Sequence, residues 1–186
     1  MATYPLIQAR HFNVASRTKI DLIVLHTMEV PRVPGTAERV ARWFAGADAP
    51  QSSAHYTVDA EKVFQCVLDK DIAWHAPGAN ETGIGIEHAG FAAQTVEQWQ
   101  EASALEMLKL SAALVAALCA KYAIPIVLVD AAGVTAKQRG ITTHKAITDA
   151  LNHGKGHWDP GPNFPMAEYI DLVQAASAPP APGDVA

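Results

Sequence analysis

The chain contains 186 residues, of which 49% are hydrophobic, and it carries a formal net charge of −5 at pH 7. This length can bury one substantial core and argues against two, so we expect a single domain. The basic residues are scattered, which leaves no electrostatic footprint for nucleic acid. Residues 1–19 lack a charged start followed by an apolar run, and no segment reads as the ~20 apolar residues that cross a bilayer. We therefore expect a soluble protein without a signal peptide or a membrane partner.

Two cysteines, Cys66 and Cys119, stand far apart in the sequence. They form no CxxC pair, so they predict neither a disulfide scaffold nor a thiolate zinc site. Because free cysteine is among the most frequently buried residue types, we expect two buried thiols.

The first regular elements are a short strand and an amphipathic helix. Residues 21–26 form an apolar run rich in β-branched side chains with an abrupt polar end, which predicts a central strand that ends at His26. Thr36 is a candidate N-cap for a helix that covers the sheet. The apolar positions of this helix recur at helical spacing and are Ala37, Val40, Ala41 and Phe44.

Four further strands are predicted before residue 90. Residues 55–58 and 63–67 flank a polar connector of hairpin length, which predicts an antiparallel pair. Residues 72–75 predict a short strand that ends in a loop. Residues 83–87 predict a buried strand that ends in the carboxylate of Glu87.

The longest predicted element is a helix that begins at Thr95. Thr95 and Gln98 have the spacing of a capping box. After this helix, the sequence Ile-Val-Leu-Val at residues 126–129 predicts a last strand. The apolar face of the helix comprises Leu105, Leu108, Ala112, Val115, Cys119 and Tyr122.

The C-terminal part of the chain is predicted to contain a polar loop that opens at residues 141–144 and a helix that starts at Pro165. From Ala175 the composition turns to alanine and proline, which is typical of an extended linker. An ordinary frayed terminus fits that composition equally well. We therefore expect one domain over residues 1–176 and a Pro/Ala-rich tail over residues 177–186.

Four of the eight histidines follow or end predicted strands: His26, His75, His88 and His144. A single histidine is more often a hydrogen-bonded structural residue than a metal ligand. Several that converge at one sheet edge favour a metal site. With the carboxylate of Asp159, whose following prolines fix the backbone, His26 and His144 would make a three-ligand site that leaves one position open for water, which is typical of catalytic zinc.

Six sequence runs, taken in order, resemble the type 2 N-acetylmuramoyl-L-alanine amidases. That family includes phage endolysins and bacterial amidases and is related to peptidoglycan-recognition proteins. The resemblance covers roughly residues 20–174 and implies a mixed α/β fold, in which helices flank a central mixed sheet. The runs are LIVLHT (22–27), SAHYTVD (53–59), AWHAPG (73–78), GIGIEHAG (83–90), TTHKAI (142–147) and HWDPGPNF (157–164).

The resemblance also implies a zinc enzyme that cuts peptidoglycan between N-acetylmuramic acid and the first L-alanine of the stem peptide. By position, His26, His144 and Asp159 match the zinc ligands and Glu87 the catalytic glutamate. Zinc would polarise the carbonyl and a water molecule, and Glu87 would move the proton. As a residue on its own, Glu87 fits a buried partner for a basic side chain as well.

Two positions before the aspartate, many members of this family carry lysine, whereas this chain has His157. An imidazole there can stabilise an oxyanion but loses its charge in the physiological pH range. The segment between His144 and Asp159 is longer than in compact relatives, which makes His153 a rival ligand. His75 and Asn80 match positions that touch the glycan or peptide, although Asn80 also fits a turn-stabilising role.

The expected partner is peptidoglycan, with zinc as cofactor, and we expect a monomer whose tail leads to a cell-wall-binding domain. The absence of a signal peptide is typical of a phage endolysin, made in the host cytoplasm to act on the wall, and also of a cytoplasmic enzyme that recycles wall fragments. The alternative from another class is a recognition module that binds peptidoglycan without cutting it. Such relatives lack a coordinating side chain at the position of Asp159.

Overall fold

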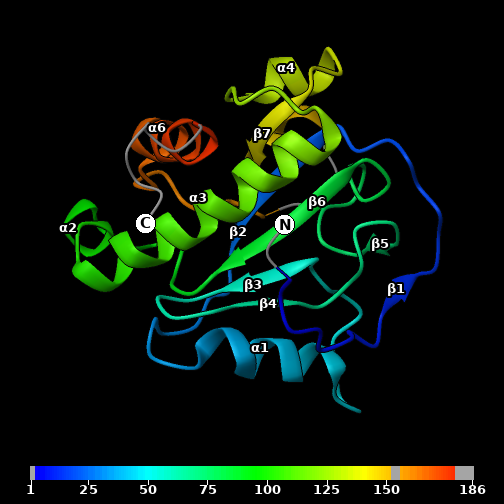
Figure 1. The fold of residues 1–186 in the computed structure, drawn as a ribbon, viewed down its shortest axis with the longest axis horizontal. Coiled ribbons are helices and arrows are strands. Elements are labelled where there is room, and N and C mark those ends of the chain that lie inside the picture. The colour runs from blue at the N-terminus through cyan, green and yellow to red at the C-terminus, as the bar shows by residue number, and fades with distance from the viewer. Residues whose placement is uncertain (1–2, 152–155, 179–186) are drawn as a thin grey trace, which may run out of the picture.

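A computed structural model describes residues 3–151 and 156–178. Its centre is a mixed five-stranded sheet of order β4-β3-β6-β2-β7, in which only β4 runs antiparallel to its neighbour (Figure 1). This confirms the predicted mixed α/β fold. The strands of the sheet are β2 (Leu22–Thr27), β3 (Tyr56–Val58), β4 (Val63–Gln65), β6 (Gly83–His88) and β7 (Gly140–Thr143).

A separate ribbon of two short strands lies beside the sheet. Strand β1 (Phe12–Asn13) pairs antiparallel with β5 (Ile72–Ala73). The predicted strand at residues 72–75 is therefore shorter than expected and lies outside the main sheet.

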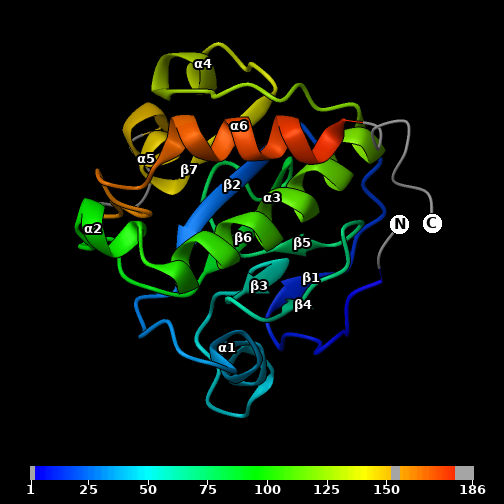
Figure 2. The same cartoon turned by 60° about the vertical axis from the view of Figure 1, so that its left-hand side comes forward.

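Helices cover both faces of the sheet. Helices α3 (Ala102–Tyr122) and α6 (Met166–Ser177) lie side by side on one face (Figures 1 and 2). Helix α1 (Thr36–Ala45) packs on the opposite face near β3 and β4, and α5 (His144–Leu151) packs there near β2. Two short helices, α2 (Val96–Trp99) and α4 (Ala131–Thr135), complete the described elements.

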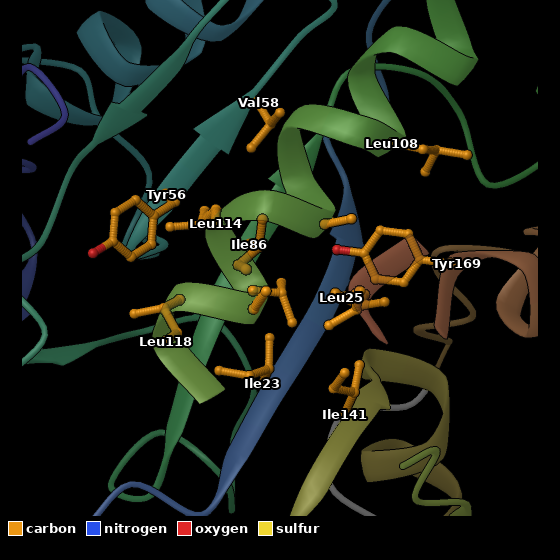
Figure 3. Close-up of a cluster of buried hydrophobic side chains, with 14 of the residues drawn as sticks. Ile23, Leu25, Tyr56, Val58, Ile86, Leu108, Leu114, Leu118, Ile141 and Tyr169 are labelled. Carbon is orange, nitrogen blue, oxygen red and sulfur yellow. The ribbon is translucent and has the colours of Figure 1, made fainter. Parts of the chain in front are cut away.

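The alternation of side chains along β2 separates two cores. Ile23 and Leu25 point toward α3 and α6 and belong to the largest apolar cluster, which Figure 3 shows. Leu22 and Val24 point to the opposite face and pack with Ile147 of α5. Because alternate residues of a strand face opposite sides, His26 extends from the α5 face of the sheet.

Helix α3 is long and apolar enough to cross a membrane by length and composition alone, so the expectation that no segment is that apolar was wrong for this helix. Of its most apolar window, 56% is buried inside the fold. Leu108, Val115 and Cys119 contribute to the core on its face of the sheet, and Cys119 and Cys66 are both free and buried, as predicted.

Two predicted helix starts differ from the structure. The N-cap of α1 is Gly35, whose φ of 77° suits glycine, while the hydroxyl of Thr36 donates to the carbonyl of Pro31. The capping box of Thr95 and Gln98 is present, but it caps the short α2. The chain breaks helical geometry at Glu101, and the long helix begins only at Ala102.

Two predictions in the last third of the chain were wrong. Residues 126–129 form no strand, because only Leu128 makes an isolated bridge, to Ile141. Both Val127 and Leu128 are about half exposed, so the apolar run does not mark a buried strand. The predicted loop at residues 141–144 is instead the end of β7 and the start of α5. The predicted terminal helix is confirmed as α6, with Pro165 as its N-cap residue.

Candidate metal centre and active site

Three neighbouring parallel strands place the candidate residues at one end of the sheet. His26 of β2 lies in register beside Glu87 of β6. The preceding residues Leu25 and Ile86 belong to the core beneath α3, so His26 and Glu87 share the opposite face. Strand β7 pairs with the other side of β2 and ends one residue before His144, which therefore arrives at the same edge.

Asp159 lies between the two histidines. Its Oδ2 is 3.0 Å from Nδ1 of His26, and its Oδ1 is 3.1 Å from Nδ1 of His144. The backbone at Asp159 is held by a hydrogen bond from the amide of Lys145 to its carbonyl oxygen. Both imidazoles are buried, with 2% and 4% of their surfaces exposed. One carboxylate thus contacts the same ring atom of two imidazoles.

Two residues of this cluster, His26 and Asp159, have pKa shifts that favour the ionisation states of metal ligands. Burial lowers the pKa of His26, although the hydrogen bond with Asp159 opposes this shift. Burial disfavours the carboxylate of Asp159, but hydrogen bonds with His144 and His26 outweigh burial and hold its pKa below the usual range. A metal requires neutral imidazole and ionised carboxylate, so this chemistry suits one.

The donor set fits a zinc ion. One ligand atom from each of His26, His144 and Asp159 lies within 4.8 Å of the other two. Two imidazoles and one carboxylate from protein leave a fourth tetrahedral position for water or substrate, which is the composition of catalytic rather than structural zinc sites.

Glu87 is a half-buried residue beside this cluster. Its Oε2 is shut off from solvent and has no hydrogen-bond partner among the described residues. Burial raises the pKa of Glu87 well above its ordinary value, and the nearby carboxylates of Asp159 and Glu29 raise it further. A carboxyl whose pKa is raised above its ordinary value is suited both to accept and to return a proton.

A cavity of about 460 Å³ opens over the cluster. The three candidate ligands, Glu87 and His157 all contribute to its wall. Three of the chain's four tryptophans also line it: Trp43, Trp74 and Trp158. Trp43 and Trp158 are about half exposed, which gives the rim of the cavity a strongly aromatic surface.

Comparison with known proteins gives concordant results. The family model described as N-acetylmuramoyl-L-alanine amidase matches residues 16–162. N-acetylmuramoyl-L-alanine amidase A of Achromobacter lyticus is 31% identical over 180 residues, which cover 91% of this chain and 92% of that protein. This chain belongs to the N-acetylmuramoyl-L-alanine amidase family. Membership supports amidase activity on peptidoglycan.

Solved structures share the fold of this amidase at low sequence identity. The hydrolase AmiA of Staphylococcus aureus, in complex with its ligand, has a TM-score of 0.73 at 17% identity, over 95% of this chain and 83% of that one. The catalytic domain of XlyA has a TM-score of 0.63 at 18% identity, over 95% of this chain and all of that domain. These similarities establish the mixed sheet and its flanking helices.

The two residues of this amidase that were expected to contact the substrate, His75 and Asn80, differ in where the fold places them. His75 is buried, with 8% exposed, and its Nδ1 lies 3.1 Å from Nε2 of His26. The side chain of Asn80 accepts hydrogen bonds from the amides of His75 and Ala76, so it holds a turn. Asn80 is not among the described residues that line the cavity.

Of the four strand-end histidines, His88 does not join the cluster. Its Nδ1 contacts the carbonyl of His26 and its Nε2 contacts the hydroxyl of Ser111, on the α3 face of the sheet. Burial lowers its pKa to about 4. The rival ligand His153 lies outside the described residues.

Sequence reasoning missed the aromatic rim and the contact between His75 and His26. Trp43 belongs to α1 and Trp158 to the loop before Asp159, so no local spacing relates them. One signal for His75 was present in the sequence, because Gly83 and Gly85 alternate along β6 and leave open the face on which His26 lies.

Proposed function

We propose that this amidase uses zinc and hydrolyses the amide bond between the lactyl group of N-acetylmuramic acid and L-alanine of the stem peptide. The observation that supports this most directly is the convergence of His26, His144 and Asp159 on the cavity that also contains Glu87. When bound, zinc supplies a Lewis acid that polarises a carbonyl and lowers the pKa of a coordinated water.

Glu87 is proposed as the general base and acid. Its carboxylate takes a proton from the attacking water and later delivers that proton to the departing alanine nitrogen. Burial raises the pKa of Glu87 above its ordinary value, which strengthens it as a proton acceptor. Its place on β6, a central strand paired on both sides, keeps the carboxyl at a fixed depth in the cavity.

His157 is proposed to stabilise the oxyanion of the tetrahedral intermediate. Its ring stacks on that of His144, with centroids 4.1 Å apart, and its Nδ1 lies 3.9 Å from Oδ1 of Asp159. The side chain is about half exposed, so one ring nitrogen can reach a substrate while the ring remains stacked. An N–H donor positioned there acts on charge that develops in the transition state.

We further propose that the substrate's sugar lies along the aromatic rim. The indoles of Trp43 and Trp158 expose apolar surface beside the cavity, and exposed aromatic surface of this kind marks binding sites. His75 and Asn80 were expected to touch the substrate. Of these two, only His75 lines the cavity.

We propose that residues 1–176 act on the bacterial cell wall as the catalytic domain of an endolysin. Structural relatives include the catalytic domain of XlyA and a mutant endolysin from Bacillus subtilis, with TM-scores of 0.63 and 0.59. Recycling of wall fragments in the cytoplasm is the alternative setting for the same reaction. Assays on intact walls and on soluble muropeptides, in parallel, separate these roles, because a recycling enzyme prefers the soluble fragments.

The proposed reaction is tested by mass spectrometry of purified peptidoglycan after incubation with the protein. Stem peptides that begin with L-alanine are expected with zinc, and they should disappear with a chelator, with Asp159→Ala and with Glu87→Gln. Glu106→Gln, which changes an exposed carboxylate on α3, is the matched control and should retain activity. Binding without cleavage would identify a recognition module instead.

A further inference from the structure

The imidazole of His75 is directed at His26. Its Nδ1 lies 3.1 Å from Nε2 of His26, and the two rings meet edge to face at 89° with centroids 5.2 Å apart. Among the described residues, this is the only hydrogen-bond contact of the His75 ring, because its Nε2 is buried without a partner. The ring therefore makes one polar interaction, with a candidate metal ligand.

The ring of His75 packs against strand β6, in space that two glycines leave free. A Cβ atom at Gly85 would lie 2.5 Å from Cγ of His75, and one at Gly83 would lie 3.3 Å from its Cε1. Real Cβ atoms essentially never approach a neighbour as closely as 2.5 Å. The side-chain oxygen of Asn80 accepts a hydrogen bond from the backbone amide of His75 and so holds this backbone in place. Glycines and turn thus hold the imidazole against the sheet.

We infer that His75 is a positioning residue that orients the metal ligand His26. Nδ1 of His26 faces Asp159, so the metal would bind at that nitrogen. An imidazole that binds a metal through Nδ1 carries its hydrogen on Nε2, where His75 Nδ1 accepts it. Such outer partners fix the tautomer and the ring orientation of a ligand.

This inference rests on the proposed zinc site and gives His75 a role other than the substrate contact expected from the family resemblance. A substrate contact acts only when substrate is present. A positioning residue acts on the metal in its absence. The two roles are therefore separated by measuring metal affinity without any substrate.

The test is a competition between the protein and a chromophoric chelator for zinc, with no peptidoglycan present. His75→Ala should weaken zinc binding by about 10–100-fold, the usual effect of removing an outer partner. His75→Asn keeps an acceptor close to the position of Nδ1 and should restore most of the affinity. Gly85→Ala keeps the imidazole but displaces it, and zinc binding should weaken again.

Gly46→Ala is the matched control, because a Cβ at Gly46 meets nothing closer than 3.4 Å and its φ is −70°. Its zinc affinity should equal that of the parent protein. Equal affinity in His75→Ala, combined with a raised KM, would overturn the inference in favour of substrate contact. A parent protein that binds no zinc would overturn the proposed metal site itself. If His75→Ala does not fold, as judged by thermal melting, the comparison of Gly85→Ala with Gly46→Ala decides.

Discussion

Replacement of Glu87 by glutamine should lower the activity of the protein and raise its stability. The substitution keeps the size of the side chain but removes the acid. Loss of a general base lowers kcat by about 10²–10⁴-fold. Because Glu87 contributes no hydrogen bond through its buried Oε2, the fold loses no partner with it. Activity should therefore collapse while the fold remains intact.

The stability gain follows from the sign of the pKa shift. Burial raises the pKa of Glu87 in the folded protein, so the folded state binds its proton more tightly than the unfolded chain, whose glutamate titrates near ~4.3. The parent protein consequently loses stability as pH rises above that value. Each tenfold difference in proton affinity is worth about 1.4 kcal/mol. For a chain of this length, that amount moves the melting midpoint by roughly 3–5 °C.

The assay is thermal melting of metal-free Glu87→Gln and parent protein between pH 4 and pH 8, with activity measured in parallel on the zinc-loaded forms. The difference in melting midpoint should grow with pH in favour of the variant. Glu106→Gln, whose parent carboxylate is exposed, should show no such trend. A variant that melts lower than the parent protein at pH 8 would refute the reasoning, because Glu87 would then stabilise the fold.

Three further predictions concern other groups. The carboxylate of Asp69 is buried, but hydrogen bonds from Lys121 and the tyrosines around it overcome burial and lower its pKa. Asp69→Ala should therefore cost about 1.5–3 kcal/mol in urea unfolding at pH 7, because hydrogen bonds to a charged group are lost while Lys121 is exposed enough to be solvated. The parent protein should lose this contribution as pH falls through the lowered pKa. Burial and the neighbouring His144 lower the pKa of His157, so its imidazole loses its charge as pH rises. His157→Lys should therefore keep activity at alkaline pH, where the activity of the parent protein declines. Identical pH profiles of the two proteins would exclude an electrostatic role for His157. Trp43→Ala should raise KM by about tenfold, equal to 1.4 kcal/mol, with kcat and melting unchanged, since the indole is half exposed.

The strands that carry the site could be predicted because they are short and buried. Residues 21–26 and 83–87 are apolar runs with polar ends, and both became central strands. Their neighbours in the sheet were less visible. Strand β7 contains Gly140, Thr142 and Thr143, which reads as a polar loop, yet β2 pairs with it and Thr142 is fully buried. Its hydroxyl donates to the carbonyl of Val129, a partner that no local pattern reveals.

Apolar composition without tertiary context misled in the opposite direction at residues 126–129. Four consecutive apolar residues predicted a buried strand, but Val127 and Leu128 remain half exposed beside β7. Only Val129 is fully buried, where it packs with Val24 of β2. Val129 differs from Val127 and Leu128 because another part of the chain packs over it. Burial therefore depends on the packing partner as well as on the segment's own composition.

The same distinction explains which parts of the candidate site were predictable. His26 and Glu87 each end a predicted strand, and the ends of parallel strands meet at one edge of a sheet, so these two could be placed together. His144 follows β7, which was predicted as a loop, so only the family resemblance implied that it reaches the same edge. His75 comes from a loop outside the main sheet, and its position depends on the absence of side chains at Gly83 and Gly85. The candidate ligand His26 is positioned by its strand, whereas His75, which contacts it, is positioned by tertiary packing. Glycines at alternate positions of a strand beside a candidate ligand therefore indicate where a second side chain can pack against that ligand.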